Sequence, residues 1–370
     1  MSEIKVNSIK GVAASTAAIT VNNTDGTCTA NITNNLSNRN LIINGAMQVA
    51  QRGTSTTTNG YLIDRFRSNL GGLDQLAFTM SQSTDAPTGF RKSLKFDVTT
   101  AETGGIGSDE YAGLRYIAEA QDVAHLLHGT SAAKTFTLSF HVKAYQTGTY
   151  VVNFYVGDSA RIYNATYTIS QSATWEKKTL TVVGDTGGSG INVDNGHGIY
   201  INWFLASGSD YTSSSSALNQ WSNYQDASWA HGQAVDITSS TDNYFQLTGV
   251  QLEVGSFSSD FEFRSFGQEL QLCKRYYEQI VPKLYILGRF SGSSGAAYAQ
   301  YHFNVEKRAA PTCSTSGTFV SSSGYTGTPS FTSTRTDSTT FYAGSVAANG
   351  ILFLHTTDSD NALIIFDAEL

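Results

Sequence analysis

The chain has 370 residues, a length that suggests two or three domains, and only 14% of the residues are charged while 12% are aromatic. Ser, Thr, Asn and Gly are abundant, and this composition is typical of β-rich proteins because aromatic residues suit a half-buried sheet and small polar residues suit turns. The formal net charge of −7 and the lack of a long basic run argue against nucleic acid as a partner.

The N-terminal residues and the cysteines bear on where the protein is made and whether it enters a membrane. The first residues contain no apolar stretch of signal-peptide length, and the chain has no apolar run of roughly 18 residues. We therefore expect neither a signal peptide nor insertion into a membrane. The three cysteines, Cys28, Cys273 and Cys313, are widely spaced and odd in number, so they predict neither a disulfide framework nor a zinc site. This pattern fits synthesis in a reducing cytoplasm.

Residues 1–40 carry isolated aliphatic side chains in short alternating stretches that end in Asn, Asp and Gly. The aliphatic residues are Ile4, Val6, Ile9, Ile19 and Val21. They are too few to close a core, so we predict an extended adaptor that becomes ordered against a partner or against its own copies. An unstructured leader is the alternative.

Residues 41–264 predict an antiparallel, jelly-roll-like β-sandwich, because strand-like runs alternate with clusters of turn residues. The runs are 41–43, 76–81, 93–98, 134–144, 148–156, 165–169, 175–183, 198–206 and 244–254. In 134–144, Phe136, Leu138, Phe140 and Val142 alternate with polar residues, which predicts a strand with one buried face. The segment 122–128 could form a helical turn, and 115–119 fits a strand equally well.

One connecting helix is predicted within the linker 265–280. Ser265 and Gln268 form a capping-box pattern, and Phe266, Cys273 and Tyr277 lie on one helical stripe, so the helix should cover about 266–279. Beyond it, residues 281–370 predict a smaller C-terminal β domain. Its strands are expected at 299–305, 339–345, 350–356 and 362–366.

Six stretches carry a family resemblance: NLIING from Asn40, QRGT from Gln51, YLIDRF from Tyr61, TLSFHVK from Thr137, FQLTGVQLEVG from Phe245 and FRSFGQELQLCKRYY from Phe263. In this order they resemble a carbohydrate-binding-module-like sandwich found in tail fibre proteins of tailed bacteriophages. KRAAPT from Lys307 is similar to a short β domain that follows this sandwich, and IKVN from Ile4 is similar to tail fibres of phages of marine bacteria. Together, the longer stretches frame residues 40–312.

The resemblance implies a structural virion protein rather than an enzyme. It implies a homotrimeric tail fibre attached to phage tail or adaptor proteins by its N-terminal segment. It also implies recognition of a host-surface glycan or an outer-membrane receptor. A head or baseplate decoration fibre would share these features and is the alternative within the same class.

The chain contains no phosphate loop, no G-x-S-x-G, no H-E-x-x-H and no C-x-x-C motif, so we predict no cofactor, no metal and no catalytic residue. His125 and His128 lack a neighbouring carboxylate, and residues 358–361 read as a turn rather than a calcium loop. The rival from a different class is a polysaccharide depolymerase with two facing carboxylates. The absence of a regular repeat argues against the β-helix such an enzyme would use.

The segment 211–231 is the best candidate for glycan contact, since it places Tyr211, Trp221, Tyr224 and Trp229 among Ser, Asn and Gln. These aromatic residues could equally pin the segment to the sandwich or form a trimer interface. Aromatic residues of the C-terminal domain compete for the same role: Tyr325, Phe331, Phe341 and Tyr342. Elsewhere, Asp64 and Arg65 could form an ion pair that fixes the start of the sandwich, or could be two solvated charges.

Overall fold

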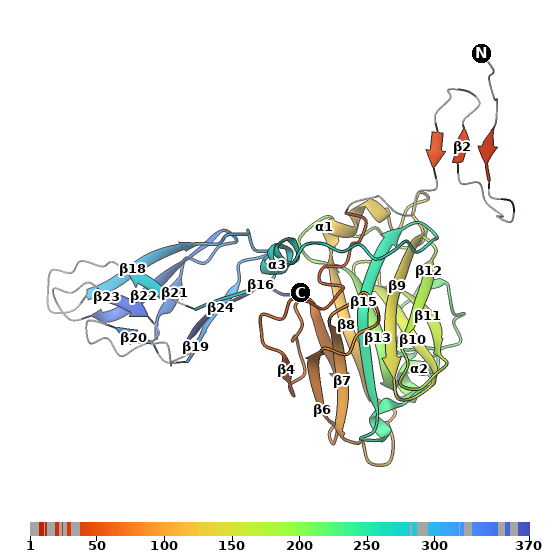
Figure 1. Ribbon diagram of the computed structural model, residues 1–370, viewed down its shortest axis with the longest axis horizontal. Coiled ribbons are helices and arrows are strands. Elements are labelled where there is room, and N and C mark those ends of the chain that lie inside the picture. Colours follow the sequence, from red (N-terminus) through yellow and green to blue (C-terminus); the bar gives the residue numbers. More distant parts are fainter. Residues whose placement is uncertain are drawn as a thin grey trace.

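The computed structural model describes a mainly β protein, drawn in Figure 1. The described residues are 7–10, 12, 19–21, 24, 28–30, 38–281, 283–286, 295–317, 319–321, 328–346, 352–355 and 362–370. Among them, no helix is long and apolar enough to cross a membrane.

Two six-stranded antiparallel sheets form the sandwich. The first sheet has the order β14 (Trp221–Asn223), β11 (Arg161–Ile169), β10 (Gly148–Val156), β13 (His197–Ser207), β8 (Tyr111–Glu119) and β5 (Phe66–Gly71). The second has the order β12 (Glu176–Val182), β9 (Phe136–Ala144), β15 (Tyr244–Val254), β7 (Ser93–Thr100), β6 (Ala77–Ser83) and β4 (Ser55–Thr56). The predicted fold class, a mainly β sandwich with a smaller β domain and one connecting helix, is therefore confirmed.

Strict alternation along the strands builds the core between the sheets. On β9, Phe136, Leu138, Phe140 and Val142 are at most 2% exposed, as their alternation predicts. Trp203 of β13 reaches the same core from the first sheet. Residues between these positions face outward from each sheet, which leaves two outer faces for function.

Short helical turns connect the strands. They are α1 (Ala120–Val123), the 3₁₀ turn Ala124–Leu126, α2 (Ser209–Thr212), and the 3₁₀ turns Asp226–Ser228 and Ile237–Ser239. The turn predicted near 122–128 is present, and 115–119 belongs to β8.

The connecting helix α3 (Phe266–Lys274) starts at the predicted capping box, where Ser265 accepts a hydrogen bond from the Gln268 amide. Its predicted end near 279 is wrong. The helix stops at Lys274, because Tyr277 and the following residues form β16 (Tyr277–Ile280) and pair with β24 (Leu363–Asp367).

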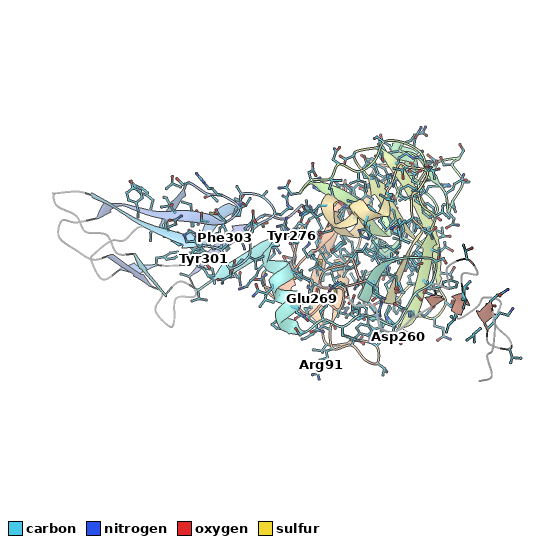
Figure 2. All side chains as sticks on the ribbon, turned by 90° about the horizontal axis from the view of Figure 1, so that it is seen from above. Arg91, Asp260, Glu269, Tyr276, Tyr301 and Phe303 are labelled. Atoms are coloured by element: carbon cyan, nitrogen blue, oxygen red, sulfur yellow. The ribbon has the colours of Figure 1, made fainter. Side chains whose placement is uncertain are left out.

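In the part of it that the structure describes, the C-terminal domain forms three small antiparallel sheets. Beside β16 and β24, its strands are β17 (Lys283–Ile286), β18 (Gly295–His302), β19 (Thr312–Ser316), β20 (Val320–Ser321), β21 (Ser330–Thr332), β22 (Ser338–Val346) and β23 (Leu352–His355). Figure 2 shows Tyr301 and Phe303 inside this narrow domain, where both rings pack against Phe366.

The segment 41–43, predicted as a strand, is not one. Leu41 donates one backbone hydrogen bond to Leu252, but polar side chains then bend the chain. Asn44 has a left-handed backbone with φ 61°, and its side chain bonds the backbone of Val49 and of Asp64. These local bonds replace a strand ladder.

A polar joint connects the sandwich to the C-terminal domain. Glu119 accepts hydrogen bonds from Arg275 Nη2 at 2.6 Å and from the Tyr276 hydroxyl at 2.6 Å. Arg308 donates to the backbone of Asn195 at 2.8 Å. Figure 2 shows Tyr276 where the narrow domain meets the sandwich.

The structure also tests whether Asp64 and Arg65 form an ion pair or are two solvated charges. Both residues are buried, with relative exposures of 0% for Asp64 and 1% for Arg65, so the interpretation as two solvated charges is wrong. Arg65 pairs with Glu369 rather than with Asp64, which instead accepts hydrogen bonds from Gln51.

The N-terminal strands β1 (Ser8–Ile9), β2 (Ile19–Val21) and β3 (Cys28–Ala30) form a small antiparallel sheet that stands to one side of the sandwich (Figure 1). Ile9 pairs with Ile19 in this sheet, and its side chain is 53% exposed. The other attachment candidates on the sheet, Ile19 and Val21, are half-buried, while Ile4 and Val6 lie outside the described residues.

Candidate functional site

A row of polar residues crosses five strands on the outer face of the first sheet, and we call it the polar ladder. Each member is the direct cross-strand partner of the next. In strand order, the polar ladder consists of Asn164, Asn153, Asn202, Arg115 and Arg67. The register alone places these side chains side by side, since directly opposed residues of antiparallel strands share a face.

Hydrogen bonds run along the ladder toward its buried end. Arg115 Nε donates to Asn202 Oδ1 at 2.6 Å, and Asn202 Nδ2 donates to Asn153 Oδ1 at 3.1 Å. Asn153 Nδ2 then donates to the backbone oxygen of Trp229 at 2.7 Å. The three asparagines are buried, whereas Arg115 and Arg67 are half-buried. The asparagine end of the ladder is therefore covered by protein, whereas the arginine end is partly accessible to solvent. We call the arginine end the open end.

Four aromatic side chains gather beside the ladder, and we call them the aromatic platform: Tyr155, Tyr200, Tyr224 and Trp229. The Tyr155 ring centroid lies 5.5 Å from that of Tyr200, 5.2 Å from that of Tyr224 and 5.5 Å from that of Trp229. All four are half-buried, so each ring keeps some surface for a ligand.

Arg115 links the platform to the ladder. Its guanidinium carbon lies 5.3 Å from the Tyr200 ring centroid and 5.6 Å from the Trp229 ring centroid, within the range of cation–π attraction. Burial lowers the pKa of Arg115, and the neighbouring charge of Arg67 also lowers it. Burial and a hydrogen bond to Asp226 raise the pKa of the Tyr224 hydroxyl.

The segment 211–231 contributes Tyr224 and Trp229 to the platform because it packs against the outer face of the first sheet. Val151, Phe204 and Ala230 form a small buried cluster, and Asn164 holds the segment by donating to the Ser228 backbone oxygen at 2.7 Å. Trp229 therefore has two roles: its backbone closes the ladder, and its ring forms part of the platform.

The structure brings together only two of the four predicted glycan-contact residues. Tyr224 and Trp229 lie 5.8 Å apart between ring centroids. Trp221 belongs to β14 at the edge of the first sheet, where its ring packs against His128 and Tyr163. Tyr211 packs edge-on against Tyr111, outside the platform.

The aromatic residues of the C-terminal domain that competed for this role are differently placed. Phe341 is 1% exposed in the core of that domain, so its ring is not available for stacking, and the half-buried Phe331 packs against it. Tyr342 packs against Tyr298, and Tyr325 lies outside the described residues.

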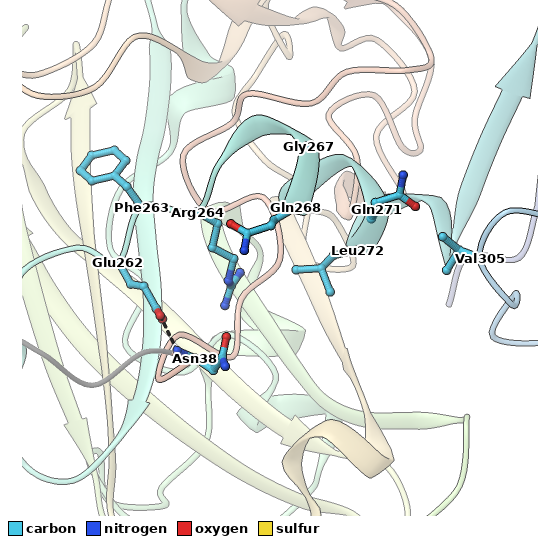
Figure 3. A pocket seen from close by; sticks show the side chains of 9 residues that line it. All are labelled: Asn38, Glu262, Phe263, Arg264, Gly267, Gln268, Gln271, Leu272 and Val305. Carbon is cyan, nitrogen blue, oxygen red and sulfur yellow. Dashed lines mark hydrogen bonds between the residues drawn. The ribbon is translucent and has the colours of Figure 1, made fainter.

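A pocket of about 660 Å³ lies along α3, as Figure 3 shows. Phe263, Leu272 and Val305 give it apolar walls. Its charged groups are already engaged: Glu262 accepts from the Asn38 backbone, and Arg264 donates to the backbone oxygens of the segment that precedes the sandwich. This pocket therefore offers few free groups to recognise a polar ligand.

A smaller hollow of about 280 Å³ lies on the outer face of the second sheet. Phe90, Phe261 and Phe263 form its aromatic wall, and their rings lie about 5 Å apart. His141 lies in the same hollow, and burial lowers its pKa. These phenylalanine rings pack chiefly on one another.

Three carboxylates meet at one end of the sandwich. Asp74, Glu102 and Glu110 each place an oxygen within 4.8 Å of the others. Glu102 is 5% exposed, and its pKa is raised by burial and by the charge of Glu110. Carboxylate oxygens are ligands that calcium prefers, and these three could hold such a cation. No local motif marks this group, because Asp74 lies in the connection between β5 and β6, whereas Glu102 and Glu110 lie in the connection between β7 and β8.

One local pattern in the sequence does indicate part of the platform, although the aromatic segment 211–231 does not contain it. Within 198–206, Ile199, Ile201 and Trp203 alternate with Tyr200 and Asn202. Alternation with apolar residues places Tyr200 and Asn202 on the outer face, where an aromatic ring beside an amide suits sugar binding.

The sequence matches no protein-family model and no curated protein. Among solved structures, it is similar to the enzymatically active domain of tailspike protein 4 of bacteriophage CBA120, with 14% identity, TM-score 0.34 and coverage of 59% of this chain and 22% of that chain. It is similar to the CBM22-1 xylan-binding domain of Paenibacillus barcinonensis Xyn10C, with 9% identity, TM-score 0.27 and coverage of 59% and 96%.

A third similar structure is the family 11 carbohydrate-binding module from Clostridium thermocellum in complex with a mixed-linked tetrasaccharide. Its identity is 10%, its TM-score 0.27, and the match covers 57% of this chain and 98% of that chain. With identities and TM-scores this low, none of the three bears on the function of this chain.

Proposed function

We propose that the sandwich is a glycan-binding module that uses the aromatic platform. The observation that carries this proposal is the arrangement of Tyr200 and Trp229 around the Arg115 guanidinium. Aromatic rings stack on the C–H faces of sugars, and the neighbouring amide and guanidinium groups bond their hydroxyls. The ladder holds these groups in place before a ligand arrives, which lowers the entropy cost of binding.

The wider proposal is a non-enzymatic structural protein of a bacteriophage tail fibre that recognises the host surface. Its support is the sequence resemblance, which spans residues 40–312. In this proposal the chain is a homotrimer, and the segment with Ile9, Ile19 and Val21 attaches it to the virion. Light scattering of the full chain in solution tests the trimer, since a monomer at micromolar concentration would contradict it.

Polysaccharide isolated from the host cell surface tests the glycan-binding proposal by titration calorimetry. Tyr200→Ala should weaken binding roughly tenfold, because a central aromatic contact contributes about 1–2 kcal/mol. Tyr145→Ala is the matched control, since Tyr145 is 46% exposed and packs against Tyr244 away from the platform. Equal affinity of the two variants would contradict the proposed site.

The acidic cluster favours a second candidate function, a polysaccharide depolymerase. A buried glutamate with a raised pKa beside a second carboxylate is the pair that glycoside hydrolysis uses. Size-exclusion chromatography of the polysaccharide after incubation with the protein separates the two functions. Polysaccharide that is shortened by the unaltered protein, but keeps its full length with Glu102→Gln and with buffer alone, would establish the enzyme.

A further inference from the structure

Arg67 and Arg115 are direct cross-strand partners on the outer face of the first sheet, at the open end of the polar ladder. Like charges that face one another across a sheet destabilise it. In the part of the chain that the structure describes, neither arginine forms an ion pair. The fold thus starts two arginine side chains from facing positions with no carboxylate paired to either, with Arg67 over the Tyr61 ring at 5.3 Å and Arg115 over the Tyr200 ring at 5.3 Å.

The free donors of these two arginines point to a ligand. Arg115 uses only Nε, which bonds Asn202, and Arg67 uses only Nε, which donates to the Ser68 backbone oxygen at 3.2 Å. The Nη atoms of both residues have no hydrogen-bond partner among the described residues. Arg52 shows the contrast. Its guanidinium carbon also lies close to the Tyr61 ring, 5.2 Å from the centroid, but it pairs with Asp367 and Glu369.

A buried amide near the pair is also unsatisfied. Asn69 lies two residues beyond Arg67 on β5, so strand alternation places both on the outer face. The residue is 5% exposed, and its Nδ2 has no hydrogen-bond partner. A buried donor left unpaired is costly, so an acceptor that a ligand brought to this amide would be favoured.

We propose that the open end of the polar ladder binds an acidic group of the glycan, a carboxylate, sulfate or phosphate carried on a sugar ring. The proposal rests on the proposed glycan-binding function and names its ligand class. Guanidinium groups bind such anions through paired hydrogen bonds, and the sugar ring itself stacks on Tyr200 or Trp229.

The acidic residues of this face are consistent with the placement of the anion. Asp158 and Asp194 lie near His197, whose pKa their charges raise, although burial lowers it overall. Asp226 is engaged by the Tyr224 hydroxyl. None of the three pairs with Arg115 or Arg67, so an acidic group is favoured at the arginine end and the neutral part of the glycan at the tyrosine end.

A glycan array that displays neutral, carboxylated, sulfated and phosphorylated sugars tests the ligand class with the full chain. The expected result is that the bound glycans are acidic. Titration with the strongest of them should show at least tenfold weaker binding for Arg115→Gln and for Arg67→Gln, and weaker binding of the unaltered protein at high salt. Carboxyl-reduced, desulfated or dephosphorylated forms of that glycan identify which anion is read.

Two control variants make this test specific. Arg91→Gln removes the same charge from an exposed residue between β6 and β7 of the second sheet and should leave the affinity unchanged. Arg115→Lys keeps the charge but loses the planar pair of donors, so its affinity should fall between those of the unaltered protein and Arg115→Gln.

The outcomes separate this proposal from the one on which it rests. If neutral glycans bind as well as acidic ones, and Tyr200→Ala weakens them while Arg115→Gln does not, glycan binding stands and the acidic ligand is overturned. If no glycan on the array binds, both proposals fail.

Discussion

Arg65 donates from Nη1 to the carboxylate of Glu369, and both side chains of this ion pair are buried, with exposures of 0% and 4%. The same guanidinium donates to the Ile117 backbone oxygen and lies 3.5 Å from the Tyr276 ring centroid. The pair thus fastens β24 and the residues after it to the sandwich.

Glu369→Gln should lower the free energy of unfolding by about 3–5 kcal/mol, because it leaves a buried guanidinium without its counter-charge. Urea unfolding measures the change. Asp367→Asn is the control, since the Asp367 side chain is 43% exposed and lies 3.4 Å from Arg52. Such an exposed pair contributes at most about 1 kcal/mol. Similar losses for the two variants would show that the Arg65 pair stabilises no more than a surface contact.

Asp64 should make stability depend on pH. Burial raises its pKa to about 6, although hydrogen bonds from Gln51 lower it. The folded state therefore holds a proton that the unfolded state has already lost between about pH 4 and pH 6. This contribution is present at low pH and is lost as the pH rises through about 6.

The comparison that isolates Asp64 is with Asp64→Asn, which does not titrate. The unfolding free energy of the unaltered protein minus that of the variant should fall by about 3 kcal/mol between about pH 4 and pH 7. Groups common to both proteins cancel in this difference. A difference that does not change with pH would show that Asp64 keeps its ordinary pKa.

Trp221→Ala should cost stability but leave glycan affinity unchanged. Trp221 donates from Nε1 to the Val183 backbone oxygen at 2.7 Å and packs on His128 and Tyr163. Since the residue is half-buried, the expected loss is about 2–3 kcal/mol, below that of a fully buried tryptophan. Thermal unfolding and glycan titration on the same sample measure both quantities. A loss of glycan affinity would show that Trp221 contributes to the binding site.

Gly249→Ala should destabilise the sandwich. Gly249 has φ +62°, and an added Cβ would lie 2.7 Å from the Phe90 ring and 2.8 Å from His141 Nδ1. A left-handed alanine costs about 1–2 kcal/mol, and overpacking adds about 1–3 kcal/mol. Gly267→Ala in α3 is the control, because its Cβ would meet open space and alanine favours a helix. A stable Gly249→Ala variant would contradict the tight contact.

Local patterns predicted much of the fold. Alternation in 134–144 predicted β9 and its buried face, and the capping box at Ser265 predicted where α3 starts. The end of α3 could not be predicted, because the partner of β16 is β24, far along the chain. Tertiary pairing there overrides the helical spacing of Phe266 and Tyr277.

The site was less predictable than the fold. An aromatic segment of the sequence indicated Tyr224 and Trp229, but Trp221 in the same segment lies at the sheet edge. The polar ladder depends on the register of five strands, and register between distant strands is not encoded in any local pattern. Arg115 and Arg67 therefore look like ordinary strand residues until the sheet is assembled.

The pairing of Arg65 with Glu369 also has a consequence for the order of folding. The two residues are 304 positions apart. A ribosome adds roughly 5–20 residues per second, and Glu369 lies 115 positions after the end of β15 at Val254, so it follows the last strand of the sandwich by about 6–23 s. During that interval a newly made sandwich carries an uncompensated guanidinium on the surface that will receive the C-terminal domain. Docking of that domain is thus a late kinetic step. An intermediate trapped before this step would expose the sandwich surface around Arg65 to chaperones.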